Sequence, residues 1–143
     1  MNLADRLALS YSALLRGLFF PGSESDSPYE PFSADTDAAD FSAGGFRSAA
    51  QLASWWQLDV SSGRAFLERL RDQSAAPEVG DDLAAAAAYE HLQLAMQATL
   101  QGRLQAVTAR APESFPFHRT RHYVVGAVSG GGLAGVLTLS VET

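Results

Sequence analysis

A proline-rich stretch near the start of the chain places the strongest constraint on its fold. Residues 18–32 read L-F-F-P-G-S-E-S-D-S-P-Y-E-P-F, with proline at positions 21, 28 and 31. Proline fixes its own φ, lacks an amide hydrogen and biases the residue before it toward extended backbone. No helix can therefore run through this stretch. We predict a stiff loop with Glu24 and Asp26 at its tip, held between an apolar run and an aromatic extended segment.

Length and composition indicate one globular domain over residues 1–143. Of the 143 residues, 47% are hydrophobic and 18% charged, which is ordinary for a globular protein with a sizeable core. The chain has no cysteine, so disulfides and thiol chemistry are excluded and a reducing compartment fits. We find neither a signal peptide nor an apolar run close to the roughly 20 residues of a membrane helix. We therefore expect a cytoplasmic protein that does not bind membranes.

The charge balance argues against nucleic acid as a direct ligand. The formal net charge is −6, and all 10 basic residues are arginine. An acidic protein is repelled by the phosphate backbone, whereas it is steered toward a basic surface. The cationic cleft of an enzyme that acts on nucleic acids is one such surface.

Apolar residues at helical spacing predict helices over 2–17, 48–57, 61–71 and 83–109. The expected N-caps are Ser48, then Ser61 or Ser62, then Asp81 or Asp82. In the last helix the apolar stripe runs to Val107, and Gly102 is where we expect a bend or an end. The first helix has a stripe of its own, made of Leu3, Leu7, Tyr11, Leu14 and Leu18.

Trp55 and Trp56 fall within the expected second helix. Neighbouring residues on a helix point about 100° apart, so at most one of the two indoles is central to the core. The other is partly exposed, and the pair is open to two interpretations, core or partner surface.

The remaining segments predict strands. Residues 29–34 suit an edge strand, because Pro31 cannot donate a ladder hydrogen bond. Residues 115–128 and 133–143 suit two strands joined by the turn S-G-G-G at 129–132. The fold class is therefore α/β with a small, largely antiparallel sheet, and the chain ends on a strand.

No catalytic or cofactor site is expected from the motifs that we tested. The spacing of Gly130, Gly132 and Gly135 matches G-x-G-x-x-G, but a strand follows where a dinucleotide site needs a helix. His118 and His122 share one side of a strand at roughly 13 Å, too far apart to hold one metal, and we expect them at the surface. Glu24 and Asp26 suit an exposed loop better than an acid–base pair in a pocket. We expect no enzyme activity, no catalytic residue and no cofactor.

Two segments together resemble the nuclease A inhibitor family. S-E-S-D-S-P-Y-E-P-F at 23–32 is similar to that family's S-E-S loop, in which an acid, a proline, an aromatic and a glutamate follow. The ending at 126–143 is similar to the family's C-terminal hairpin, with a turn at Gly131, then L-A-G, Thr138 and a final V-E-T. Residues 35–80 match poorly.

The resemblance implies an α-β-α sandwich with helices at both faces of the sheet. It also implies an inhibitor of a metal-dependent, sugar-nonspecific nuclease of the ββα-metal class. In that role the protein binds the nuclease through the nuclease's Mg²⁺, has no direct contact with nucleic acid, and is expected to be a monomer.

The resemblance also implies which residues bind the partner. Thr143 would reach the catalytic metal of the nuclease, since its carboxylate and hydroxyl are hard oxygen ligands suited to Mg²⁺. Glu24 would accept hydrogen bonds from basic residues of the nuclease, as a phosphate does. The other expected binding residues are Ser23, Ser25, Asp26 and Glu142.

One departure from the family pattern leaves an alternative open. The family carries an aromatic residue before the long helix, whereas this chain has P-E-V-G-D-D at 77–82, so Trp55 or Trp56 is the candidate substitute. The alternative function is an interaction or regulatory module of the same fold that binds a protein other than a nuclease.

Overall fold

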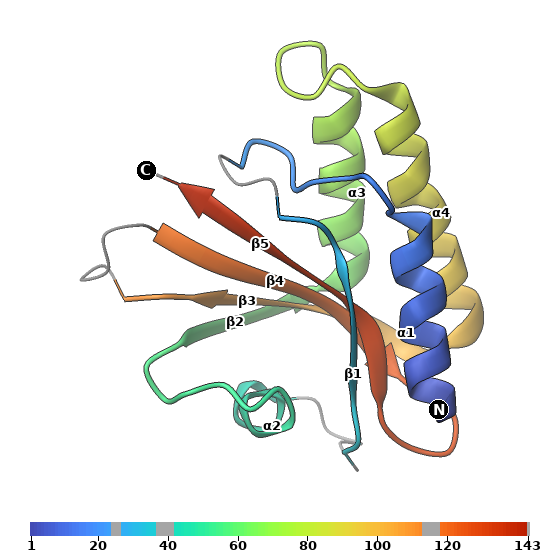
Figure 1. The fold of residues 1–143 in the computed structure, drawn as a ribbon, viewed down its shortest axis with the longest axis vertical. Coiled ribbons are helices and arrows are strands. Elements are labelled where there is room, and N and C mark those ends of the chain that lie inside the picture. Colours follow the sequence, from blue (N-terminus) through green and yellow to red (C-terminus); the bar gives the residue numbers. More distant parts are fainter. Residues whose placement is uncertain (24–26, 37–41, 113–117, 143) are drawn as a thin grey trace.

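The structure is a computed structural model that describes residues 1–23, 27–36, 42–112 and 118–142 (Figure 1). In chain order its elements are α1 (Leu3–Leu14), β1 (Glu30–Ala34), α2 (Ala43–Ala49), β2 (Gln57–Ser62), α3 (Gly63–Ala75), α4 (Leu83–Thr99), β3 (Gln101–Arg110), β4 (His118–Ala127) and β5 (Leu133–Glu142). The expected mixed α/β class is confirmed. No helix in these described ranges is long and apolar enough to cross a membrane.

The strands form one antiparallel sheet. Over the described residues it has five strands in the order β1-β5-β4-β3-β2, and every neighbouring pair is antiparallel. The expected hairpin is confirmed, because β4 and β5 pair from His118–Glu142 to Ala127–Leu133 across a glycine turn. The turn glycines have φ of 90°, 115° and 94°, which only glycine adopts without strain. The predicted edge strand is confirmed as β1.

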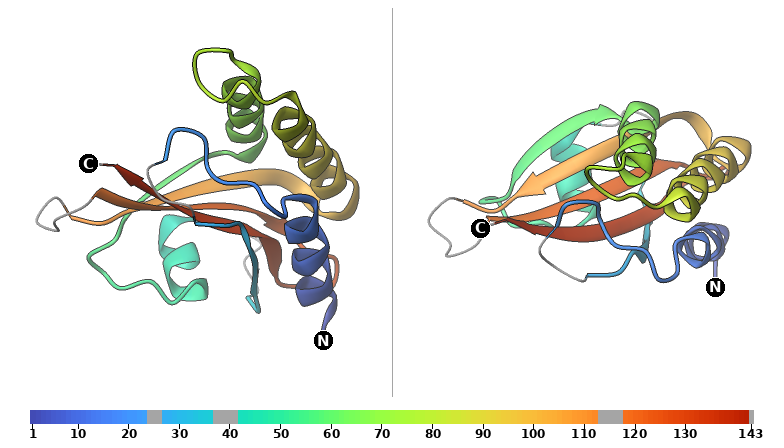
Figure 2. Two further views of the ribbon diagram at one scale, coloured as in Figure 1. Left: turned by 45° about the horizontal axis from the view of Figure 1, so that its top comes forward. Right: turned by 90° about the horizontal axis from the view of Figure 1, so that it is seen from above.

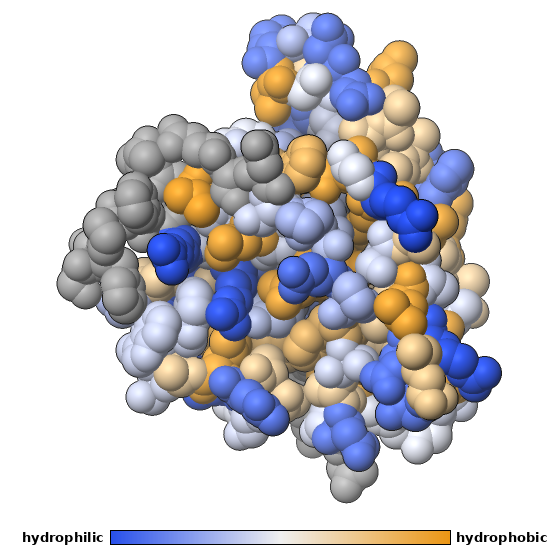
Figure 3. Space-filling model, viewed as in Figure 1, coloured by the Kyte–Doolittle hydropathy of each residue, from blue (hydrophilic) through white to orange (hydrophobic). Residues whose placement is uncertain are grey.

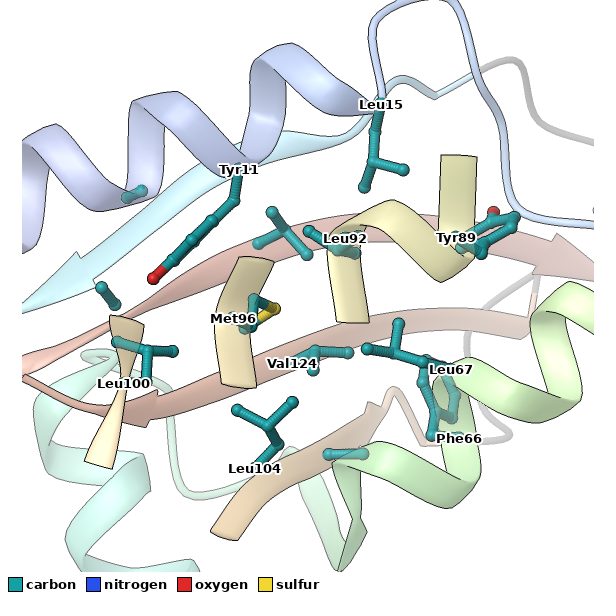
Figure 4. Close-up of a cluster of buried hydrophobic side chains, with 14 of the residues drawn as sticks. Tyr11, Leu15, Phe66, Leu67, Tyr89, Leu92, Met96, Leu100, Leu104 and Val124 are labelled. Atoms are coloured by element: carbon teal, nitrogen blue, oxygen red, sulfur yellow. The ribbon is translucent and has the colours of Figure 1, made fainter. Parts of the chain in front are cut away.

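Helices α1, α3 and α4 cover one face of the sheet through a shared core (Figure 4). We call it the helix-face cluster. Leu92 and Met96 of α4 are fully buried in it, and Val124 of β4 faces them from the sheet. Further members are Tyr11, Leu15, Phe66, Leu67, Tyr89, Leu104, Ala134 and Val136.

A second cluster lies on the opposite face of the sheet. Tyr123 and Val125 belong to it, while Val124 between them belongs to the helix-face cluster, as alternation along a strand requires. Phe46 of α2 packs against Tyr123 with ring centroids 4.8 Å apart. Trp56 is also a member, so we call it the Trp56 cluster.

The first helix is correct in position, but its buried face is displaced by one residue. The buried residues are Ala4, Ala8, Tyr11 and Leu15, while Leu3 and Leu14 are exposed. Ala4 and Ala8 let α1 lie close to β1 and β5, whereas Tyr11 and Leu15 reach into the helix-face cluster.

Two of the predicted helices are wrong. The segment 83–109 is helical only to Thr99, and β3 begins at Gln101. Gly102 has φ of 69° and marks the change. The segment 48–57 is mostly turn. The helix in this region is α2, which begins after its N-cap Ser42 and already ends at Ala49. The caps Ser62 and Asp82 are confirmed, whereas β2 was not predicted.

We predict that Gly135→Ala destabilises the protein by at least about 2 kcal/mol, because overpacking a close contact forces the backbone apart. A Cβ at Gly135 would lie 1.8 Å from the carbonyl oxygen of Val124, in the middle of the β4–β5 pairing. Urea unfolding measures the change. The matched control is Gly44→Ala in α2, where a Cβ meets nothing within 4 Å. Equal stability of the two variants would contradict this reading of the sheet.

Candidate partner-binding site

The end of β5 extends beyond its neighbour β1. The pairing of β1 with β5 runs from Leu133 to Leu137, while β5 continues to Glu142. The loop that leads from α1 to β1 lies along this last part of β5 (Figures 1 and 2). The unpaired edge of β5 is thus next to the proline-rich stretch.

Hydrogen bonds fasten this loop to β5 on both sides of its tip. The amide of Val141 donates to the side-chain oxygen of Ser23 at 3.0 Å. The hydroxyl of Thr138 lies 3.4 Å from the carbonyl oxygens of both Ser27 and Pro28. Ser23 thus satisfies a backbone donor of β5 that has no strand partner, which is the usual requirement for a half-buried amide.

Aromatic residues on either side of the loop tip are packed into the helix-face cluster. Phe20 and Tyr29 are partly buried against it, and the hydroxyls of Tyr29 and Tyr89 are 2.6 Å apart. The hydroxyl of Tyr89 also lies 3.3 Å from the carbonyl oxygen of Phe19. The prediction that the loop is held between two hydrophobic anchors is confirmed for these residues.

The tyrosine pair remains uncharged at neutral pH. Burial raises the pKa of Tyr89 to about 12, partly offset by its hydrogen bond to Tyr29. Burial, and then the neighbouring Tyr89, raise the pKa of Tyr29 well above its usual value. Both hydroxyls therefore act only as hydrogen-bonding groups that connect the loop to α4.

The structure describes only part of the predicted binding set. Ser23 is half-buried and bonded to β5, and Glu142 is the last residue of that strand. The predicted residues Glu24, Ser25, Asp26 and Thr143 lie outside the described residues. The two sequence segments that carry the family resemblance thus meet at the contact between Ser23 and Val141.

His122 is buried, so the expectation that it lies at the surface is wrong. Its ring stacks on Phe20, with centroids 4.1 Å apart and planes 11° apart, and its Nε2 lies 2.7 Å from the hydroxyl of Ser140. Its Nδ1 is buried without a hydrogen-bond partner in the described part of the chain. Its strand alone gives no sign of this burial, which comes from Phe20 of the proline-rich stretch.

No metal centre is found within the described residues. They contain no group of three or more histidine, aspartate or glutamate side chains placed to hold an ion. The side chain of His118 lies outside the described set, so the predicted separation of the two histidine side chains stays a prediction.

Neither the models of known protein families nor the curated proteins compared with this chain gave a match.

One residue of the tryptophan pair lies in the core and the other at the surface. Trp56 is 8% exposed and Trp55 is 46% exposed. This confirms that only one of them is central to the core, although they lie in a turn before β2 rather than in a helix. Sequence reasoning did not connect them with Arg121, whose guanidinium lies over the Trp56 ring.

We predict that His122 makes stability fall as the pH is lowered from 6.5 toward 4. Burial, followed by Arg69 and Arg110, lowers the pKa of His122 to about 4, whereas the unfolded chain binds the proton near pH 6.5. The contribution of neutral His122 to the free energy of unfolding is therefore complete above pH 6.5. It decreases by about 2.5 kcal/mol when the pH reaches 4.5.

Urea unfolding at pH 7.5 and pH 4.5 tests this. His122→Gln should lose less stability between the two pH values than the parent protein does, since its side chain does not titrate. The control is His91→Gln, because His91 is an exposed residue of α4. A parent-like pH dependence in His122→Gln would rule out this role.

Proposed function

We propose that this protein inhibits a metal-dependent, sugar-nonspecific nuclease of the ββα-metal class by occluding its active site. The observation that carries the proposal is the hydrogen bond from Val141 to Ser23, at 3.0 Å. It joins the two segments on which the resemblance to nuclease A inhibitors rests. One binding surface made of both segments needs such a junction.

Chain connectivity supports a joint action of Glu24 and Thr143. Glu24 directly follows Ser23, and Thr143 comes two residues after Val141. Both residues are therefore close in sequence to the hydrogen bond that joins the two segments, which favours their action on one partner.

The chemistry divides between the two residues. In this proposal Thr143 supplies its carboxylate and hydroxyl as oxygen ligands to the Mg²⁺ of the nuclease. Glu24 accepts charge-assisted hydrogen bonds from arginines that otherwise hold the scissile phosphate. Ser23, Ser25, Asp26 and Glu142 border them, and Ser23 acts by positioning.

The same proposal covers the remaining expectations. The sheet and its two clusters would make an α-β-α sandwich with helices at both faces. The protein would act in the cytoplasm as a monomer without catalysis of its own, and its net charge of −6 would favour approach to a basic cleft.

We predict that removing Thr143 raises the inhibition constant for such a nuclease at least about 100-fold, equivalent to about 2.7 kcal/mol. The reason is the loss of the ligand to the metal. A titration of nuclease activity on DNA measures it. A short tag fused after Thr143 should act in the same way, whereas a tag before Met1, at the other end of the molecule in Figure 1, should not. Full inhibition by the C-terminally tagged protein would exclude metal ligation.

We predict that Glu24→Ala weakens inhibition at least about tenfold and makes the remaining inhibition less sensitive to salt, because a charged contact is lost. The matched control is Glu90→Ala, which removes an exposed carboxylate from α4. If Glu24→Ala and Glu90→Ala inhibit equally well, the loop has no part in the mechanism.

A further inference from the structure

A groove of about 670 Å³ lies on the sheet beside the candidate partner-binding site. It borders the ends of β4 and β5, where strongly hydrophilic and hydrophobic side chains lie next to one another in Figure 3. Its volume is within the range of about 300–1,000 Å³ that small-molecule sites occupy. The residues that matter for the argument are Glu30, Trp55, Trp56, Arg119, Arg121 and Leu139.

Aromatic surface forms one wall of this groove. Trp55 stacks on Trp56 with ring centroids 4.7 Å apart and planes 24° apart. Trp56 is fixed in the Trp56 cluster, and the Arg121 guanidinium lies 4.8 Å from its ring centroid. Trp55 remains 46% exposed on this rigid support. An exposed indole held in place is a stacking surface for a planar ring, because little conformational entropy remains to be lost.

Positive charge lies at one end of the groove. Arg119 and Arg121 are two residues apart on β4, so both project to the face that carries Trp56. In the described part of the chain neither forms an ion pair with a carboxylate. Arginine pairs of this kind bind phosphate through several parallel hydrogen bonds.

Negative charge lies at the other end. Glu30 of β1 pairs with Leu137 of β5, while Arg121 of β4 pairs with Leu139. From the usual strand spacing and rise, Glu30 and Arg121 are about 12 Å apart at their Cα atoms. The groove thus carries an acceptor at one end, with the cations and the aromatic surface together at the other.

We propose that this groove binds a mononucleotide. The phosphate lies against Arg119 and Arg121, the base stacks on Trp55, and Glu30 accepts hydrogen bonds from an amino group or from hydroxyls at the far end. The proposal is independent of nuclease inhibition, because the groove faces the Trp56 cluster and involves neither Glu24 nor Thr143.

The test uses the full chain with adenosine 5′-monophosphate as the probe and no nuclease present. Tryptophan fluorescence excited at long wavelength, together with calorimetry, should give saturable binding. Adenosine lacks the anion and ribose 5-phosphate lacks the base, so each should bind at least tenfold more weakly. Equal binding of ribose 5-phosphate and the nucleotide would overturn the stacking role of Trp55.

Variants locate the binding site. Arg119→Gln and Arg121→Gln should each raise the dissociation constant at least tenfold, and Trp55→Leu should do the same by calorimetry. Arg103→Gln is the matched control, because Arg103 lines a different groove. Arg119→Gln remains decisive if Arg121→Gln fails to fold, since it is the Arg121 guanidinium that packs on the Trp56 ring.

Three outcomes would overturn the proposal. They are the absence of saturable binding of the nucleotide, unchanged binding in Arg119→Gln, and binding of an acidic tryptophan-containing peptide where the nucleotide does not bind. The last outcome would make the groove a protein-docking surface instead.

Discussion

The antiparallel pairing of β4 with β5 supports both hydrophobic clusters and the candidate site. The two strands pair along their whole length, and alternate residues of β4 belong to different clusters. Gly135 allows this closeness, because any side chain there would collide with the backbone of Val124. The helices on one face, the Trp56 cluster on the other and the far end of β5 therefore depend on one hairpin.

The unequal lengths of β1 and β5 explain why the loop lies where it does. A strand that continues past its neighbour exposes backbone donors and acceptors, which must be satisfied by other groups. Here the side-chain oxygen of Ser23 accepts from the amide of Val141, and the side-chain hydroxyl of Thr138 donates to the carbonyls of Ser27 and Pro28. Pro31 lies within β1 and Pro28 contacts Thr138 of β5, so the proline-rich stretch contributes both to the short edge strand and to the cover of the longer one.

Much of the fold was predictable from sequence, and the errors have physical causes. The hairpin, the edge strand and two N-caps depend on local chemistry, namely glycine turns, proline and side-chain acceptors. The segment 83–109 was misread because Leu100, Leu104 and Val107 keep helical spacing by coincidence, although they are buried from a loop and a strand. The sequence marked Gly102 as a bend or an end, but only pairing with β2 and β4, which is a long-range feature, makes the residues that follow a strand.

In the candidate site, too, some features were predictable from the sequence and others were not. The resemblance named Ser23 and Glu142 among the expected binding residues, and a hydrogen bond joins Ser23 to Val141, the neighbour of Glu142. The burial of His122 could not be read from its own strand, because it depends on Phe20, which is 102 positions away in sequence. The groove at Trp55 and Arg119 likewise combines segments that are distant in the chain.

The attachment of the proline-rich loop has a consequence for protein engineering. Ser23 is bonded to β5 on one side of the tip, and Ser27 and Tyr29 are bonded to β5 and α4 on the other. A peptide inserted between Ser23 and Ser27 would be joined at both ends to residues that are hydrogen-bonded to β5. Because the chain also has no cysteine, the domain is suited to testing as a scaffold for peptide display.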